Sequence, residues 1–379
     1  MESVIQDAVN EENNTNTDAP DEAGGQPADT GTGTDAQSEQ FGDVKDAQIL
    51  VVGTGGAGNN MVTRMQRKDI NGAETLAINT DKQHLEMAEA DRKILIGQDL
   101  TEGLGAGGHP QQGAKAAEEN RSELRSLFND ADMVFLCAGL GGGTGTGSIP
   151  VLADIARSED CIVIGTVTMP FSIEGARQSK AEDGLYRLRQ HVDTAIVIEN
   201  DKLLDIAGDM PLDQAFGVAD ELITTMIKGV TETISTPSLV NLDYADVKSI
   251  MHSGGVAVVG YGESDTNNRG KEAIAEALSN PLLDVDFEGA NGALVHVAGG
   301  EGMTLNEIND VGQTVMEKLD PNAQVIWGAR VNEELQGKIQ VISIITGVES
   351  PYVLGPVDEQ EQEAEVQEME DLGLQVVDH

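Results

Sequence analysis

Five runs of apolar residues divide residues 47–200, and stretches with helical spacing of apolar positions separate them. Strands that are apolar throughout are typical of a parallel sheet with helices on both faces. We therefore predict a doubly wound α/β domain over residues 47–210. The apolar runs are 47–53, 74–79, 133–139, 161–170 and 194–200, and the helical patterns span about 59–67, 112–129, 149–157 and 178–190.

A long helical pattern follows at about Pro211–Ser235, with Pro237 just past its end. Proline suits the first turn of a helix and disfavours continuation beyond its last turn, so we predict a central linking helix over 211–235. Strands then outweigh helices, which predicts a smaller, mixed α+β second domain over 236–355. Its strands are expected at 255–263, 292–300, 323–330 and 338–347, and its helices at 270–278 and from Thr304, where Glu307 completes a capping box.

Both ends of the chain are strongly acidic. Residues 1–46 hold 12 acidic residues and one Lys, and residues 356–379 hold 9 acidic residues and no Lys or Arg. With so little apolar content, both are predicted to be disordered, the first as an N-terminal arm and the second as a tail. A helical turn at 1–10 and an apolar tip at 372–377 are candidate partner-binding segments, and simple disorder is the alternative for each.

The formal net charge of −43 argues against a nucleic-acid partner, because neutralising phosphates takes clustered Lys and Arg. Such a charge suits a salt-rich cytoplasm, in which repulsion between surface charges is screened. An acidic mesophilic protein is the alternative. No secretory signal or membrane-spanning run is evident, so we expect a cytoplasmic protein without direct membrane insertion. The two cysteines, Cys137 and Cys161, are expected to be free and buried.

The chemistry begins at a glycine-rich segment that follows the first strand. Gly53, Gly55 and Gly58 form a GxGxxG pattern that opens a helix at Asn59 and Asn60. Glycine lets backbone N–H groups approach an anion, and the start of a helix attracts negative charge. Alone, this pattern would equally fit a dinucleotide fold or a structural tight turn.

A second loop of the same kind, Gly139–Gly147, follows the strand at 133–139. It has Thr but no Lys, so backbone amides and hydroxyls would hold the anion. Two such loops beside adjacent parallel strands suit a triphosphate better than a pyrophosphate. A third glycine-rich stretch, 103–110, contains Gly107 and Gly108 and would line the γ-phosphate, whereas its His109 is more often a loop filler.

The segment INTD places Asn79 and Asp81 near the same loops. Asp81 would hold Mg²⁺ through water, since this ion prefers oxygen ligands. An Asx turn at the end of a strand is the alternative.

Several motifs occur in an order that resembles the FtsZ family of tubulin-like cell-division GTPases. They are VVGTGGAGNN, AINTD, GAGGHP, GGGTGTG, PFSIEGAR, IENDKL, AFGVADE and NLDYAD, and the likeness spans about Ala47 to Gly355. The acidity and the loop sequences are most similar to those of archaeal, haloarchaeal members. The resemblance implies a GTP/GDP-binding protein that assembles into filaments, with Mg²⁺ as cofactor and K⁺ as a candidate second cation.

The resemblance also assigns roles to residues. It implies that Gly55, Gly56, Ala57, Gly58, Asn59 and Asn60 line the α- and β-phosphates, and that Gly141, Gly142, Gly143, Thr144, Gly145, Thr146 and Gly147 close over them. Glu174 would meet the ribose. The family's arginine four residues beyond that Glu is Gln178 here, preceded by Arg177, which leaves the contact from that arginine open.

For the base, the resemblance implies Asn200, Phe216 and Asp220. Phe216 would stack on the purine, and Asp220 would accept hydrogen bonds from guanine N1 and N2, which adenine cannot offer. Taken alone, Phe216 and Asp220 would equally be a core aromatic and a solvated acid on one helix face.

The catalytic residues implied are Asn241, Asp243 and Asp246 of NLDYAD, which in the family project onto the nucleotide of the next subunit. In isolation, two such carboxylates are more often a helix cap. A head-to-tail homopolymer would thus hydrolyse GTP at its subunit contacts, at a mid-cell ring. Adaptors that tether it to the membrane and other division proteins would bind its termini, and a second FtsZ-family protein is a further candidate partner.

Two other functional classes remain open from the sequence. A Rossmann oxidoreductase would share the first glycine loop but not the second loop or NLDYAD. A tubulin-superfamily filament used as a scaffold or for cell shape would keep the pocket without constricting the cell.

Overall fold

The computed structural model describes residues 47–348 and 353–354, except 69, 71, 236–243, 255–256, 280–285 and 288. Its larger sheet has the strand order β11-β6-β5-β4-β1-β2-β3, and every pair is parallel except β11 with β6. The predicted parallel sheet is confirmed. The strands are β1 (Ile49–Thr54), β2 (Ala73–Asn79), β3 (Arg92–Leu95), β4 (Met133–Gly139), β5 (Ile162–Met169), β6 (Thr194–Glu199) and β11 (Val353–Leu354).

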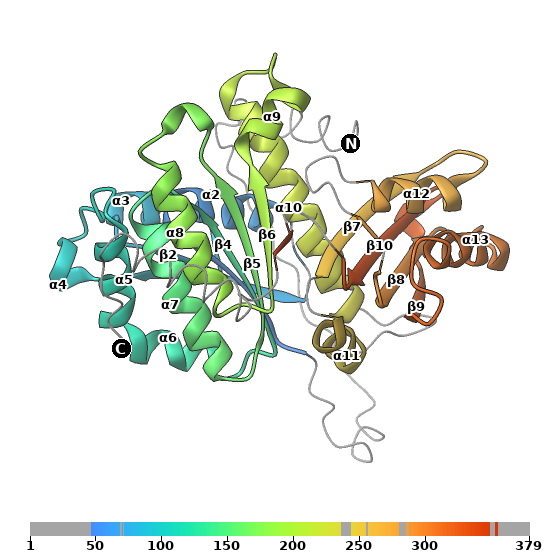
Figure 1. Cartoon of the computed structure of the whole chain (residues 1–379), viewed down its shortest axis with the longest axis horizontal. Helices are drawn as coiled ribbons and strands as arrows, with labels where there is room; N and C mark the ends of the chain where they lie inside the picture. The colour runs from blue at the N-terminus through green and yellow to red at the C-terminus, as the bar shows by residue number, and fades with distance from the viewer. Residues whose placement is uncertain are drawn as a thin grey trace, which may run out of the picture.

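Helices cover both faces of this sheet (Figure 1). In β1, Ile49 and Val51 pack into the core shared with α2 and α10, whereas Leu50 and Val52 pack into the core shared with α5 to α8. Alternating side chains of one strand therefore bury both faces. The helices of this domain are α2 (Gly55–Arg67), α3 (Lys82–Met87), α4 (Gln98–Thr101), α5 (Pro110–Glu119), α6 (Arg121–Phe128), α7 (Thr144–Ser158), η1 (Ser172–Glu174), α8 (Gln178–Arg189), α9 (Asn200–Ala207) and the central α10 (Leu212–Ser235).

The second domain is built on a four-stranded mixed sheet, as predicted. Its order is β7-β10-β8-β9, antiparallel apart from the parallel pair β8–β9. Figure 1 shows α10 running between the two sheets, and its apolar residues share one core with strands of both. The elements are α11 (Tyr244–Gly254), β7 (Ala257–Ser264), α12 (Arg269–Leu278), β8 (Gly292–Gly299), α13 (Leu305–Met316), β9 (Gln324–Val331), η2 (Glu333–Leu335) and β10 (Ile339–Thr346).

Several element boundaries differ from the sequence prediction. The single helix expected at about 112–129 is wrong: α5 ends at Glu119 and α6 begins at Arg121. Asn120 between them leaves helical geometry (φ −97°, ψ 11°), and its Oδ1 accepts a hydrogen bond from the N–H of Gly97. The structure also adds β3, α3, α4 and α9, and β11 returns the chain to the edge of the first sheet.

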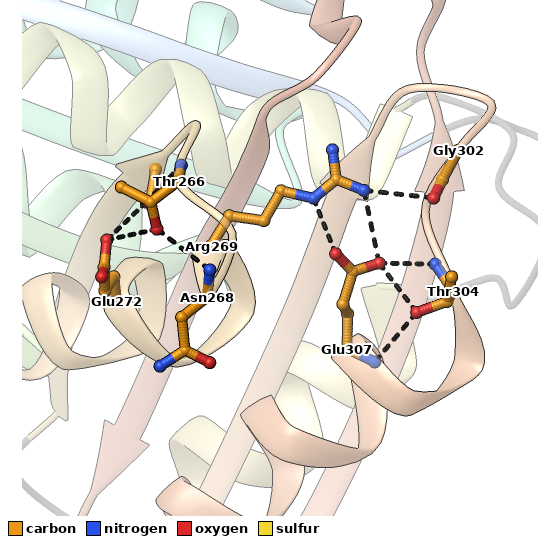
Figure 2. Close-up of polar contacts among 8 residues, drawn as sticks. Thr266, Asn268, Arg269, Glu272, Gly302, Thr304 and Glu307 are labelled. Carbon is orange, nitrogen blue, oxygen red and sulfur yellow. Dashed lines mark hydrogen bonds and ion pairs between the residues drawn. The ribbon is translucent and has the colours of Figure 1, made fainter.

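The predicted capping box at Thr304 is confirmed and is part of a larger network that joins α12 to α13. Figure 2 shows Arg269 reaching across to Glu307, with Nε 2.7 Å from Oε1, while its Nη2 donates to the Gly302 carbonyl. Glu307 also accepts from the Thr304 backbone N–H and hydroxyl. The hydrogen bond from Arg269 is the main reason that the pKa of Glu307 lies below its usual range. The network fixes the starts of both helices.

Cys137 and Cys161 are free and buried, as predicted, and burial raises the pKa of their thiols to about 12 and about 11. Both are therefore neutral. Within the part of the chain that the structure describes, no helix has the length and apolarity needed to cross a bilayer.

Candidate nucleotide site

The first glycine loop is the first turn of a helix. β1 ends at Thr54 in extended conformation, and α2 begins directly at Gly55, four residues earlier than the apolar pattern predicted. Thr54 makes no side-chain capping bond to the N–H groups of that turn. These donors therefore remain able to hold an anion, which the helix dipole also favours.

The second loop has the same construction. β4 ends at Gly139, and α7 begins at Thr144 after Gly143, which gives the turn no side-chain cap. Gly141 has φ 90°, in the left-handed region that favours glycine. The segment GGGTGTG thus crosses from loop into helix, and its last residues provide further N–H donors at a helix start.

The two loops touch because β1 and β4 are neighbours in the sheet. A Cβ on Gly55 would lie 2.7 Å from the Gly145 nitrogen, and one on Gly58 would lie 2.3 Å from the Cys137 carbonyl oxygen. A Cβ on Gly139 would lie 2.6 Å from the Cβ of Ala57. The glycines therefore allow a backbone approach that larger residues would prevent, and the two glycine loops lie against each other.

Hydroxyl groups join the cradle to its supports. Thr54 and Ser148 share a hydrogen bond of 2.6 Å, and Thr80 and Thr144 share one of 2.7 Å. The hydroxyl of Thr146 is buried without a hydrogen-bond partner among the described residues, and its methyl Cγ2 faces α8, where a Cβ on Gly184 would lie 2.5 Å from it. Through its side chain, Thr146 thus contacts α8 instead of the neighbouring loop, and its backbone remains the predicted phosphate contact.

Asn59 and Asn79 form hydrogen bonds with the backbone near the two glycine loops. Asn59 is fully buried, and in the orientation that satisfies its neighbours its amide donates to the carbonyls of Gly53 and Ile78 and accepts from Asn79. Asn79 Oδ1 accepts from the N–H groups of Thr80 and Asp81. Both side chains thus position backbone, whereas Asn60 is exposed.

Asp81 caps α3, because its Oδ1 accepts a hydrogen bond from the His84 N–H at 3.1 Å. The Asx turn at the end of β2 is made by Asn79, whose Oδ1 accepts from the Asp81 N–H, whereas Asp81 itself is a helix N-cap. The third glycine stretch folds over this point, since Gly105 donates to the Thr80 carbonyl and Asp81 pairs with Leu104. Gly107 and Gly108 follow with left-handed φ values of 59° and 73°. No group of three His, Cys, Asp or Glu side chains suited to a metal occurs among the described residues.

The residues expected to contact the ribose and the base lie in η1, at the start of α8, in α9 and in α10. Glu174, in η1, forms a 2.5 Å ion pair with Arg177 and accepts from the Phe171 N–H, while Gln178 begins α8. The ring of Phe216 lies 5.8 Å from that of Phe171, tilted by 56°. These two rings form an aromatic wall.

Two polar groups near this wall have unusual environments. Asn200 begins α9, and its Oδ1 is buried without a partner among the described residues. Asp220 lies 4.0 Å from Arg64, and burial raises its pKa to about 7 against the lowering effect of Arg64. Buried polar groups that lack partners, and acids with perturbed pKa values, are typical of binding sites.

The described part of the NLDYAD motif, Tyr244–Asp246, lies at the opposite end of the sheet. Asn241 and Asp243 lie outside the described residues, whereas Asp246 is in the first turn of α11. In the same turn, Tyr244 donates to the carbonyl of Asp132, immediately before β4, and Lys248 pairs with Asp160, shortly before β5. Asp246 is thus at the amino ends of strands whose carboxyl ends carry the glycine loops.

Sequence reasoning did not single out Arg64, Thr80 or Ser148. Thr80 stands within INTD, so the motif itself was a signal for it. Arg64 and Ser148 meet their partners only through the tertiary fold, and no local pattern marks them.

Comparisons with known proteins agree with this geometry. The profile of the Tubulin/FtsZ family GTPase domain matches residues 48–208, and that of the FtsZ family C-terminal domain matches residues 255–349. The chain is 54% identical over 320 residues to cell division protein FtsZ 2 of Methanocaldococcus jannaschii, covering 84% of this chain and 83% of that protein. It is 48% identical to the FtsZ 2 protein of Halobacterium salinarum, covering 88% and 84%. Among solved structures, the empty FtsZ dimer of M. jannaschii matches with a TM-score of 0.74 at 51% identity, covering 80% of this chain and 89% of that one.

Proposed function

Because the chain belongs to the FtsZ family of GTPases, we propose that it is a cell-division protein that polymerises head to tail and hydrolyses GTP between adjacent subunits. In each contact, the end of one subunit that carries α11 would bring Asp246, with Asn241 and Asp243, to the glycine loops of the next. Phosphoryl transfer needs mainly positioning and charge neutralisation, so an acid that orients the attacking water would complete the site.

One observation carries this proposal: Asp246 and the glycine loops are at opposite ends of one sheet. Tyr244 anchors this turn at Asp132, before β4, whereas the second loop follows Gly139 at the other end of the same strand. At about 3.3 Å per residue, a strand of seven residues separates its ends by about 20 Å. Asp246 therefore cannot reach the nucleotide of its own subunit, whereas the Asp246 of a stacked neighbour can.

Exposed apolar side chains on segments beside the proposed nucleotide site support self-association. Leu104 is 81% exposed, Ile173 93% and Leu204 60%. They come from the third glycine stretch, η1 and α9, which border the predicted nucleotide. Exposed apolar side chains of this size are available for contact with a partner subunit.

For the nucleotide, the two loops would hold the phosphates of GTP or GDP, and Phe216, Asn200 and Asp220 would recognise guanine. Mg²⁺ would be held by phosphate oxygens, water and Asp81, because this ion usually keeps several waters and takes few protein ligands. It would neutralise phosphate charge, and K⁺ is a second candidate cation. In the cell, the filament would act in the cytoplasm at a mid-cell ring, with adaptors at the termini, which lie outside the described residues.

The test is complementation between two defective variants. Asp246→Ala should bind GTP and assemble but hydrolyse it very slowly. The double variant Phe216→Ala/Asp220→Ala should fail to recognise guanine but retain an intact Asp246. Mixed above the assembly concentration, they should hydrolyse GTP faster than the sum of their separate rates, since Asp246 of the double variant serves the pocket of D246A. Light scattering and GTP binding confirm the state of each variant.

Two results would overturn the proposal. One is a mixture that gives only the sum of the separate rates although both variants co-assemble. The other is wild-type protein, diluted until unassembled, that hydrolyses GTP as fast per molecule as filaments do. A filament that forms and hydrolyses GTP normally but locates away from the division site would instead favour the scaffold alternative.

A further inference from the structure

Arg64 links the two halves of the nucleotide site. It lies on α2, whose first turn is the first glycine loop, yet its side chain reaches the base side of the pocket. Its Nε is 4.0 Å from Asp220 Oδ2, and its Nη2 is 3.2 Å from the position that a Cβ on Gly217 would occupy. Gly217 stands next to Phe216, so the guanidinium lies along the wall proposed for the base. Both side chains of the pair are largely buried, at 16% and 17% exposure.

Among the residues that the structure describes, few charges act on Asp220. They are Arg64 from α2, Glu221 on α10 itself and, from β4, the thiol of Cys137, which is neutral because burial raises its pKa to about 12. Glu221 is itself paired with Lys68. Near Asp220, α9 contributes the apolar Ala207 against Val218, and Ile196 and Val259 face the middle of α10. Arg330 of β9 is paired with Glu232, three turns further along the helix. Arg64 is therefore the cation that the structure pairs with Asp220 among the described residues.

The protonation state of Asp220 decides which base it can recognise. An ionised carboxylate only accepts hydrogen bonds, which suits the N1–H and N2–H donors of guanine. A protonated carboxyl group offers one O–H donor and one acceptor, which clashes with guanine N1–H but suits the N1 acceptor and N6–H donor of adenine. Burial alone favours the protonated form, and Arg64 opposes it.

We propose that Arg64 is a positioning residue for base selection, which keeps Asp220 ionised and oriented so that the pocket selects guanine over adenine. This inference rests on the proposed recognition of guanine by Asp220. Arg64 need not touch the nucleotide. Its effect passes through the carboxylate, so it should depend on pH in a way that a purely structural contact would not.

The experiment measures dissociation constants for GTP and ATP by isothermal titration calorimetry from pH 6 to 9, at fixed high KCl and below the assembly concentration. The variants are Arg64→Met, which removes the charge at similar length, and Arg64→Lys, which retains it. In wild-type protein, the preference for GTP should fall as the pH drops below about 7. In R64M this fall should begin about one pH unit higher, so that GTP affinity at pH 7 decreases about fivefold and recovers towards pH 9.

R64K should keep a profile closer to that of wild type, because a cation still faces Asp220. Should R64M fail to fold, as judged by thermal melting, R64K and Arg64→Gln give the same comparison of charged and neutral side chains. An equal loss of GTP and ATP affinity at every pH would mean that Arg64 only supports the fold, and would overturn the inference. So would a pH profile that is unchanged when the charge is removed.

Asp220→Asn separates this inference from the proposed function. If D220N keeps the wild-type preference for GTP, another group recognises the base, and both the base assignment and this inference fail. If D220N loses the preference while R64M retains the wild-type pH profile, the base assignment stands and this inference alone fails. In the double variant R64M/D220N, the pH dependence caused by R64M should be absent.

Discussion

Replacing Gly55 with alanine tests whether contact between the two glycine loops controls phosphate binding. Gly55 has φ 72°, and a Cβ there would lie 2.7 Å from the Gly145 nitrogen. The left-handed conformation costs an L-residue about 1–2 kcal/mol, and moving two backbones apart adds to that cost. Gly56 is a matched control one residue further on, because a Cβ there would meet only the His84 ring, at 3.4 Å.

The two variants should therefore differ clearly. We expect Gly55→Ala to lower the free energy of unfolding by at least about 1–2 kcal/mol, and Gly56→Ala to stay within about 0.5 kcal/mol of wild type. If the strain displaces the first turn of α2, the same energy lowers GTP affinity about 5- to 30-fold, since about 1.4 kcal/mol is a factor of ten.

Urea unfolding without nucleotide and calorimetric GTP titration, both at constant KCl, measure the two effects. Equal stability and equal GTP affinity in G55A and G56A would refute the reasoning, since the loops would then not need their close contact. A stability loss in G55A with unchanged affinity would show that the contact supports the fold alone.

Three further predictions concern stability. Burial lowers the pKa of His296 on β8 to about 4, so wild-type stability should fall by up to about 3 kcal/mol as the pH drops from 6.5 to about 4, and His296→Leu should remove this component from the pH profile of urea unfolding. Arg269→Met should cost about 1.5–3 kcal/mol at pH 7, and less once acid protonates Glu307, whereas the control Arg187→Met, in an exposed pair, should cost under about 0.5 kcal/mol. With a net charge of −43, the melting temperature should rise from low to high KCl, and a fall would contradict the expectation of salt dependence.

The features that the sequence predicts best depend on local backbone chemistry. The glycine loops, the capping box at Thr304 and the apolar strands all follow from spacing within a few residues, and the structure has each of them. Even there, α2 and α7 start several residues before the apolar pattern, because glycines carry no periodic signal although they form the first helical turns.

The structural features that the sequence does not predict depend on contacts between residues that are distant in the chain. The break at Asn120 coincides with its hydrogen bond to the Gly97 N–H, 23 residues away, which no local pattern reveals. Likewise, Arg64 meets Asp220 only because α2 packs on α10. The position of Asp246 also follows from the fold, since Tyr244 reaches Asp132 across 112 residues of sequence.

The proposed nucleotide site is connected through α2 and α10 towards the other end of the subunit. α2 begins at the phosphate loop, and its C-terminal part is tied to α10 through Arg64 with Asp220 and Lys68 with Glu221. From Glu221, α10 continues to Ser235, about 21 Å at 1.5 Å per residue, and ends before the segment that leads to Asp246. An axial shift of α10 caused by a change at the proposed base or phosphate contacts would therefore be passed towards the segment that we propose acts in hydrolysis. Because that segment would act on the neighbouring subunit's GTP, the occupancy of one pocket would bear on hydrolysis in the next.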